Sequence, residues 1–157
     1  QRAIVFQLGG GTIDTNGVNL ALAGSVGSGA GSFTKAGAGT LTLNATSTYT
    51  GSTNVNGGTL AIGVSNAISS GALNVNGGGT LDLGTNSISV GLVTTAGASP
   101  VIAGAGTITS SAGFLLNHTG DTDIPSVLAG NVGLFKAQTN TVTLSLRIHP
   151  IQHSLHT

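Results

Sequence analysis

The sequence predicts an all-β protein, a right-handed parallel β-helix with about seven rungs of roughly 20 residues each. Three observations support this fold class. A Gly-Thr-apolar unit recurs along the chain, short segments alternate Thr with apolar residues, and Gly is 27 of 157 residues while charged residues are only 5%. Helix is disfavoured because Thr, Val, Asn and Gly dominate and no 3.6-residue apolar pattern is visible.

Internal repeats set the expected rung length. The Gly-Thr unit places Thr40, Thr59, Thr80 and Thr107 in four copies, GTLTL, GTLAI, GTLDL and GTITS, at steps of 19, 21 and 27 residues. NVNGG occurs at 54–58 and again at 74–78, and FTKAGAGTLTL (33–43) aligns without gaps on LFKAQTNTVTL (134–144). Near-identical copies at this period are typical of a solenoid, whereas a β-sandwich has turn signals about every 8 to 12 residues.

The alternation also predicts which side chains face inward. Successive side chains of a strand point to opposite faces, so the apolar residues of each copy fill the lumen. Stacking then places Thr over Thr and Asn over Asn, which forms hydrogen-bonded ladders without charge repulsion. We expect the lumen to be too narrow for many aromatic rings and to hold Leu41, Leu43, Leu60, Ile62, Leu81, Leu83 and Ile108.

Composition excludes several function classes. Net charge is zero, and the four basic residues are far apart, so we expect no nucleic-acid partner: Arg2, Lys35, Lys136 and Arg147. No run of about 18 apolar residues predicts a membrane-spanning helix. We expect one β-helix over residues 1–145, and an atypical tail at 146–157 that is disordered or non-native. The lack of Met and Cys fits a processed or partial chain from an exported bacterial protein.

Three stretches of the sequence resemble the autotransporter passenger-associated repeat: LGGGTIDTNG, SFTKAGAGTLTL and STYTGSTNVNGGTLAIG. The repeat's Lys-x-Gly-x-Gly-Thr-Leu-x-Leu element falls on 35–43, its Tyr-Thr-Gly turn on 49–51, and its Thr-x-Val-x-x-Gly-Thr-Leu strand on 53–60. The clear motif covers about 30 residues, and weaker copies extend over about 8–144. The resemblance implies a passenger β-helix of a Gram-negative autotransporter, with a C-terminal β-barrel translocator in the full-length protein.

The expected function follows from that resemblance. The segment is displayed on the bacterial cell surface, outer membrane-attached or secreted, as a stiff stalk. It offers a surface for adhesion to a host or neighbouring-cell ligand or for self-association. Two alternatives stay open: a self-assembling extracellular fibre subunit, and a β-helical enzyme acting on polysaccharide. Four Asp, no Glu and scattered cations disfavour the enzyme, so no catalytic residue and no cofactor is assigned.

Candidate metal sites are few. Asp121 and Asp123 with His118 form the one acidic cluster, which we interpret as a polar loop interrupting the solenoid rather than a Ca²⁺ site. GGGTID (9–14) and GGGTLD (77–82) approach a Ca²⁺-binding repeat but carry Thr where it needs Gly, so we expect outward-facing Asp14 and Asp82. The tail histidines could bind metal, but Pro150 interrupts their spacing: His149, His153 and His156.

Other motifs are weaker still. Thr46, Thr48 and Thr50 with Tyr49 predict an exposed polar patch, whose uneven spacing disfavours an ice-binding grid. No hydrolase nucleophile motif is present. Gly27–Gly31 lacks the pattern of a nucleotide-binding loop. Asn44 and Asn117 begin glycosylation sequons, a short motif that is common by chance.

Overall fold

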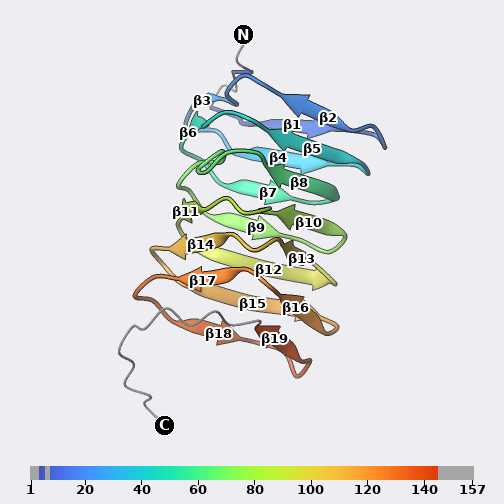
Figure 1. The fold of residues 1–157 in the computed structure, drawn as a ribbon, viewed down its shortest axis with the longest axis vertical. Helices are drawn as coiled ribbons and strands as arrows, with labels where there is room; N and C mark the ends of the chain where they lie inside the picture. Colours follow the sequence, from blue (N-terminus) through green and yellow to red (C-terminus); the bar gives the residue numbers. More distant parts are fainter. Residues whose placement is uncertain (1–3, 6–7, 145–157) are drawn as a thin grey trace.

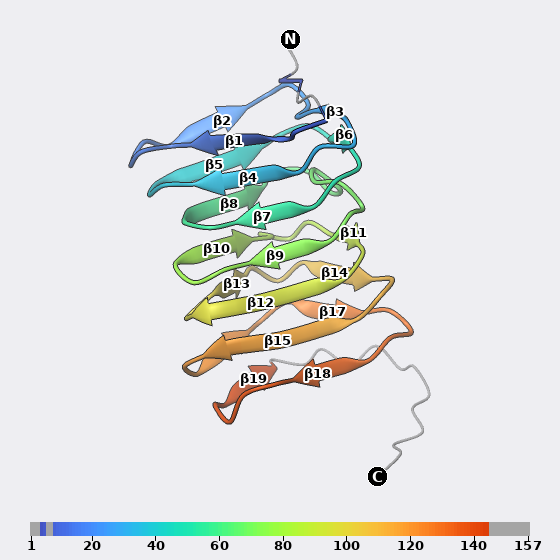
Figure 2. The same cartoon turned by 180° about the vertical axis from the view of Figure 1, so that it is seen from behind.

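Short Thr- and Gly-rich segments form 19 strands that stack in parallel turns, in a computed structural model that describes residues 4–5 and 8–144. Each turn begins with a strand of one seven-stranded sheet, so the described chain makes about seven turns, and it contains no helix (Figure 1). The view from behind shows the same stack, with the described chain descending turn by turn (Figure 2). The predicted parallel β-solenoid is confirmed.

The first face is a continuous seven-stranded parallel sheet. Its column of Cα partners runs from Phe33 through Thr53, Leu73 and Val93 to Phe114, and successive partners are 20 or 21 residues apart. Each turn therefore has nearly the predicted length. The strands, in spatial order, are β1 (Gly11–Asp14), β4 (Phe33–Ala36), β7 (Thr53–Val55), β9 (Leu73–Val75), β12 (Val93–Ala98), β15 (Phe114–Thr119) and β18 (Leu134–Lys136).

The second face stacks the Gly-Thr copies in register, with Thr40 beside Thr59 and Thr59 beside Thr80. The next partner is Val101, not Thr107. The fourth copy, with Thr107, lies on the third face instead, because the 27-residue step is longer than one turn. The strands are β2 (Leu20–Leu22), β5 (Thr40–Leu43), β8 (Gly58–Ile62), β10 (Gly79–Asp82), β13 (Val101–Ala103), and the separate pair β16 (Thr122–Ile124) and β19 (Val142–Leu144).

The third face is divided into two sheets. One contains two strands and the other contains three, and residues 63–71 of the intervening turn form bends and turns instead of a strand. The strands are β3 (Ser28–Gly29) and β6 (Thr48–Tyr49), then β11 (Ile88–Val90), β14 (Thr107–Ser110) and β17 (Val127–Ala129). This interruption is the main departure from a regular solenoid.

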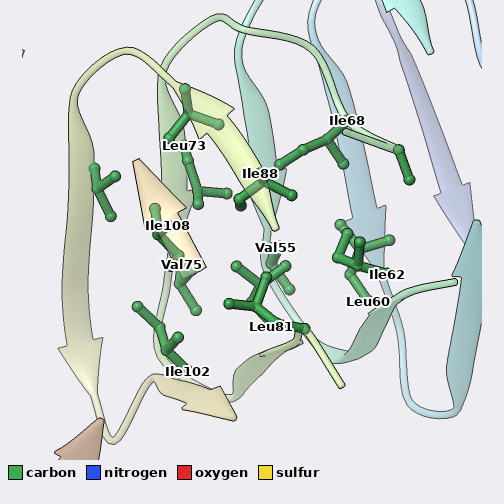
Figure 3. Packing of buried hydrophobic residues seen from close by; sticks show 14 of the residues in the cluster. Val55, Leu60, Ile62, Ile68, Leu73, Val75, Leu81, Ile88, Ile102 and Ile108 are labelled. Atoms are coloured by element: carbon green, nitrogen blue, oxygen red, sulfur yellow. The ribbon is translucent and has the colours of Figure 1, made fainter. Parts of the chain in front are cut away.

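The lumen is packed with aliphatic side chains from all three faces (Figure 3). The seven residues predicted to fill it are all buried, and Ile62, the most exposed of them, is only 3% accessible. Among the described residues, three aromatic side chains are also buried, Phe33, Tyr49 and Phe114, so the lumen has more room for rings than predicted. Phe33 and Tyr49 pack edge to face with ring centroids 5.9 Å apart, a geometry favoured by the ring quadrupoles.

Two sequence repeats occupy equivalent positions in the stack. Lys35 and Lys136, which align in the long-range repeat, lie in one column of the first face through Val55, Val75, Thr95 and Leu116. The two NVNGG copies pair directly, and Asn74 Nδ2 donates to Asn54 Oδ1 over 2.8 Å. The predicted Asn ladder is confirmed. Among the described residues, no helix could cross a membrane.

Candidate binding site

A hollow of about 470 Å³ lies where the third face is interrupted. It is bordered by β6 above, by β11 below, and by the irregular segment 63–71 between them. In Figures 1 and 2, β6 and β11 lie along the same edge of the stack. Residues of three successive turns line the hollow: Thr46, Ser47, Thr48, Tyr49, Thr50, Asn66, Ile68, Ser69, Ser70 and Ser89.

The burial pattern of the irregular segment explains the interruption. Ala67, Ile68 and Ser69 are consecutive and all buried. A pleated strand turns alternate side chains to opposite faces, so it cannot bury three in a row. The segment therefore leaves strand geometry, and the third face is divided at this turn.

Several hydroxyls around the hollow are held in place by backbone carbonyls of neighbouring turns. Ser47 Oγ donates to the carbonyl of Ala67 over 2.5 Å, and Ser69 Oγ donates to that of Gly51 over 2.7 Å. Thr48 Oγ1 donates to the carbonyl of Gly27 in the turn above. Each of these hydroxyls keeps acceptor capacity after donating its proton. The rim is therefore both polar and fixed.

Other polar groups of the hollow are exposed and unused. In the described part of the chain, the hydroxyls of Thr46, Ser70 and Ser89 make no hydrogen bond to protein, and all three residues are exposed. Asn66 accepts a bond from the Ser89 N–H through Oδ1 over 3.0 Å, which leaves its amide NH₂ group free to donate. These groups give the hollow both donors and acceptors for a ligand.

Tyr49 corrects the predicted polar patch. The patch is confirmed for Thr46, Thr48 and Thr50, which are exposed, but Tyr49 is only 2% accessible and faces the lumen. Its hydroxyl and the Thr53 hydroxyl are 2.5 Å apart. Burial raises the pKa of the Tyr49 phenol, opposed by hydrogen bonds to Thr53 and Ser69. Alternation with exposed threonines on both sides was the sequence signal that placed this ring inside.

Lys35 is a buried charge that the sequence reasoning treated only as one of four scattered cations. Its side chain is fully buried, and Nζ donates to the carbonyls of Ala36 and Gly37 over 2.8 Å each and of Gly57 over 3.0 Å. Burial lowers the pKa of Lys35, and the Asp14 carboxylate opposes the shift. The side chain therefore bonds to the backbone of two successive turns of the solenoid. The sequence signal for this burial is spacing: Lys35 lies two residues after Phe33, so in a strand both side chains point to the same face.

His118 does not join the two acidic residues predicted beside it. Its ring is buried, with Nδ1 2.7 Å from the Thr95 hydroxyl, whereas Asp121 and Asp123 are exposed. The expected polar loop is also wrong: residues 122–124 form β16, because Asp121 accepts a bond from the Thr141 N–H over 2.7 Å and the turn stays in register. In the described residues no three His, Cys, Asp or Glu side chains gather as a metal site.

The remaining candidates have structural positions. Asp14 is exposed as predicted and Asp82 is half-buried, and each accepts a backbone N–H two residues later, at 2.7 and 2.9 Å. Gly27–Gly31 contributes β3. Asn44 and Asn117 of the sequons are exposed. Arg2, Arg147 and the predicted tail with His149, His153 and His156 lie outside the described residues.

Comparison with protein families identifies the repeat. Residues 33–62 match the family model of the passenger-associated-transport-repeat. The match spans β4 to β8, two strands of the first face, two of the second and β6 of the third, and confirms the resemblance over these residues. It ends directly before the irregular segment that forms the hollow. Comparisons with curated proteins and with solved structures gave no match. The passenger-associated repeat and the solenoid together fit an autotransporter passenger.

Proposed function

We propose that this chain is a segment of a secreted autotransporter passenger, displayed at the bacterial cell surface as a stiff stalk with an adhesive face. The observation that supports it most is the passenger-associated-transport-repeat at 33–62, placed within about seven stacked turns. In the full-length protein, the proposal includes a linked translocator that carries the passenger outward.

The stacking supports the stalk. Seven turns at an interstrand spacing of about 4.8 Å give a rod of roughly 35 Å. Each turn is joined to the next by backbone hydrogen bonds of the continuous first face, and side-chain bonds such as Asn76 to Asn56, at 2.7 Å, reinforce it. A solenoid can extend a long distance without a large core, because each turn packs only against its neighbours.

A non-enzymatic role is part of the proposal. Polysaccharide-acting sites use paired carboxylates to move protons. Asp14 and Asp82 are each engaged by a nearby backbone N–H, and Asp121 is engaged by the next turn. These contacts give the carboxylates turn-forming roles.

Surface display tests the proposal directly. The chain is fused between a signal peptide and a β-barrel translocator in a Gram-negative host, and intact cells are treated with protease. We expect the segment to be accessible to antibody and removed by protease from intact cells. Retention in the periplasm, with a folded control passenger exported normally, would contradict the passenger role.

Self-association is the second candidate function. Leu134 and Phe135 of the last described turn are 47% and 67% accessible, a large apolar exposure at one end of the stack. Burial of this end against another copy would produce oligomers or fibres. Sedimentation of the purified chain distinguishes this candidate: we expect Phe135→Ser to shift any oligomer toward monomer, and a concentration-independent monomer would eliminate it.

A further inference from the structure

We propose that the hollow at residues 46–50, 66–70 and 89 is a binding site for an uncharged saccharide. This inference deepens the adhesive part of the proposed function by naming a site and a ligand class. It rests on that function only for its biological setting, because binding itself is a property of the isolated chain. The argument uses the charge, the free hydroxyls and the rigidity of the hollow.

The lining carries no charged side chain. All ten lining residues are Thr, Ser, Tyr, Asn or Ile. A phosphate, sulfate or carboxylate ligand is normally matched by Arg or Lys, and a cationic ligand by Asp or Glu. A neutral ligand has the smallest desolvation cost on entering such a site, because no charged group is buried without a partner. The electrostatics therefore select an uncharged molecule.

The free polar groups match a polyol. The free hydroxyls of Thr46, Ser70 and Ser89 come from three successive turns, and a hydroxyl can donate one hydrogen bond and accept others. Sugar hydroxyls have the same dual capacity, so either partner can adopt either role. The free NH₂ group of Asn66 adds two N–H donors, and the bond from the Ser89 N–H to Asn66 Oδ1 fixes the orientation of this amide. Threonine methyl groups supply the apolar contacts that sugar C–H groups require.

The hollow is largely preformed. The bonds from Ser47, Thr48 and Ser69 to backbone carbonyls fix its rim, and Tyr49 closes its floor from the lumen. Its volume of about 470 Å³ falls within the range of about 300–1,000 Å³ typical of small-molecule sites. A fixed site loses little conformational entropy on binding, which matters for weak saccharide contacts.

Tyrosine fluorescence provides the binding assay. Tyr49 is the one tyrosine of the chain, which has no tryptophan, so the emission reports the hollow. The purified full chain is titrated with cellohexaose, as a bacterial-type neutral glucan, and with poly-N-acetyllactosamine, as a host-type neutral glycan. Heparin and polysialic acid are the anionic probes. We expect saturable binding to one of the neutral probes, which also identifies the source, with dissociation constants of about 10 μM to 1 mM.

Matched variants locate the site. Ser89→Leu and Ser70→Leu remove a free hydroxyl and fill the hollow, so we expect affinity to fall about tenfold or more. Thr109→Leu is the control, because Thr109 is the register partner of Ser89 one turn lower, is also exposed and lies outside the lining. It should bind as the parent chain does. Far-ultraviolet circular dichroism checks that all three variants keep the solenoid.

Several outcomes would overturn the inference. They are preferential binding of heparin or polysialic acid, no binding of either neutral probe, or equal losses in Ser89→Leu and Thr109→Leu. If the variants lose structure, saccharide-induced amide shifts in the parent chain decide: shifts must centre on residues 46–50 and 66–70. Surface display without saccharide binding rejects this inference alone, while binding without display rejects only the passenger role.

Discussion

The first and third faces of this solenoid are built from the same turns, yet one is continuous and the other is divided. On the first face, partners from Phe33 to Leu134 follow at 20 or 21 residues without a break. On the third face, the turn at 63–71 has no strand and exposes a hydroxyl-rich hollow. The second face is also paired across this turn, through β8 and β10. Two faces that continue across this turn therefore keep successive turns in register, and the third face can be irregular.

The largest expected effect is loss of a lumen side chain on the continuous face. Leu73→Ala removes a fully buried residue of β9, and we expect a loss of about 3–4 kcal/mol in unfolding free energy. Ile68→Ala, beside the hollow, should cost about 2 kcal/mol because the irregular segment can relax around the deletion. Urea denaturation measures both. Equal losses would show that the irregular turn is packed as rigidly as the sheet.

A second comparison uses the glycines that lead into the first face. A Cβ at Gly71 would lie 2.3 Å from the Gly51 carbonyl oxygen, whereas a Cβ at Gly91 meets nothing closer than 3.5 Å. We therefore expect Gly71→Ala to cost about 2–3 kcal/mol through a forced backbone shift, and Gly91→Ala to stay within about 0.5 kcal/mol. Thermal unfolding measures the pair, and similar midpoints would contradict close stacking of these turns.

A third effect is confined to acid pH. Burial, reinforced by Lys136, lowers the pKa of His118, and its Nε2 is buried without a hydrogen-bond partner in the described structure. The unfolded chain therefore binds this proton more readily than the native state. Stability is fully present above pH about 6.5 and declines as pH falls from there toward the lowered native pKa. The difference between the urea midpoints at pH 7.5 and pH 5.5 should be smaller in His118→Gln than in the parent chain. The same pH dependence in both would refute the role of His118.

The smallest effect concerns the Asn ladder of the first face. A double-mutant cycle with Asn54→Ala and Asn74→Ala should give a coupling of about 0.5–1 kcal/mol, because the two amides bond across adjacent turns. Substituting the exposed Ser89 by Ala on the third face should change stability by less than about 0.5 kcal/mol. Zero coupling in the cycle would show that the ladder adds no stability beyond the backbone bonds.

Local pattern predicted the strand positions better than it predicted the candidate site. Thr40, Thr59 and Thr80 stack as their spacing indicated, and alternating Leu and Ile residues are buried. The Gly-Thr unit with Thr107 lies on another face than the other three copies, and the unit alone does not indicate its face because its sequence is the same on both. Tyr49 was predicted exposed because its neighbours are polar, although a strand buries alternate positions regardless of residue type.

By itself, the sequence determined the all-β class, the turn of about 20 residues, the apolar lumen and the passenger-associated repeat. These features follow from period and alternation, which are local properties of the chain. The tertiary structure alone decided that Lys35 is buried on three carbonyls, that His118 is separated from the aspartates, and that the third face opens into a hollow. Each depends on which residues of one turn lie beside those of the next, and that pairing is not visible in a single copy of the repeat.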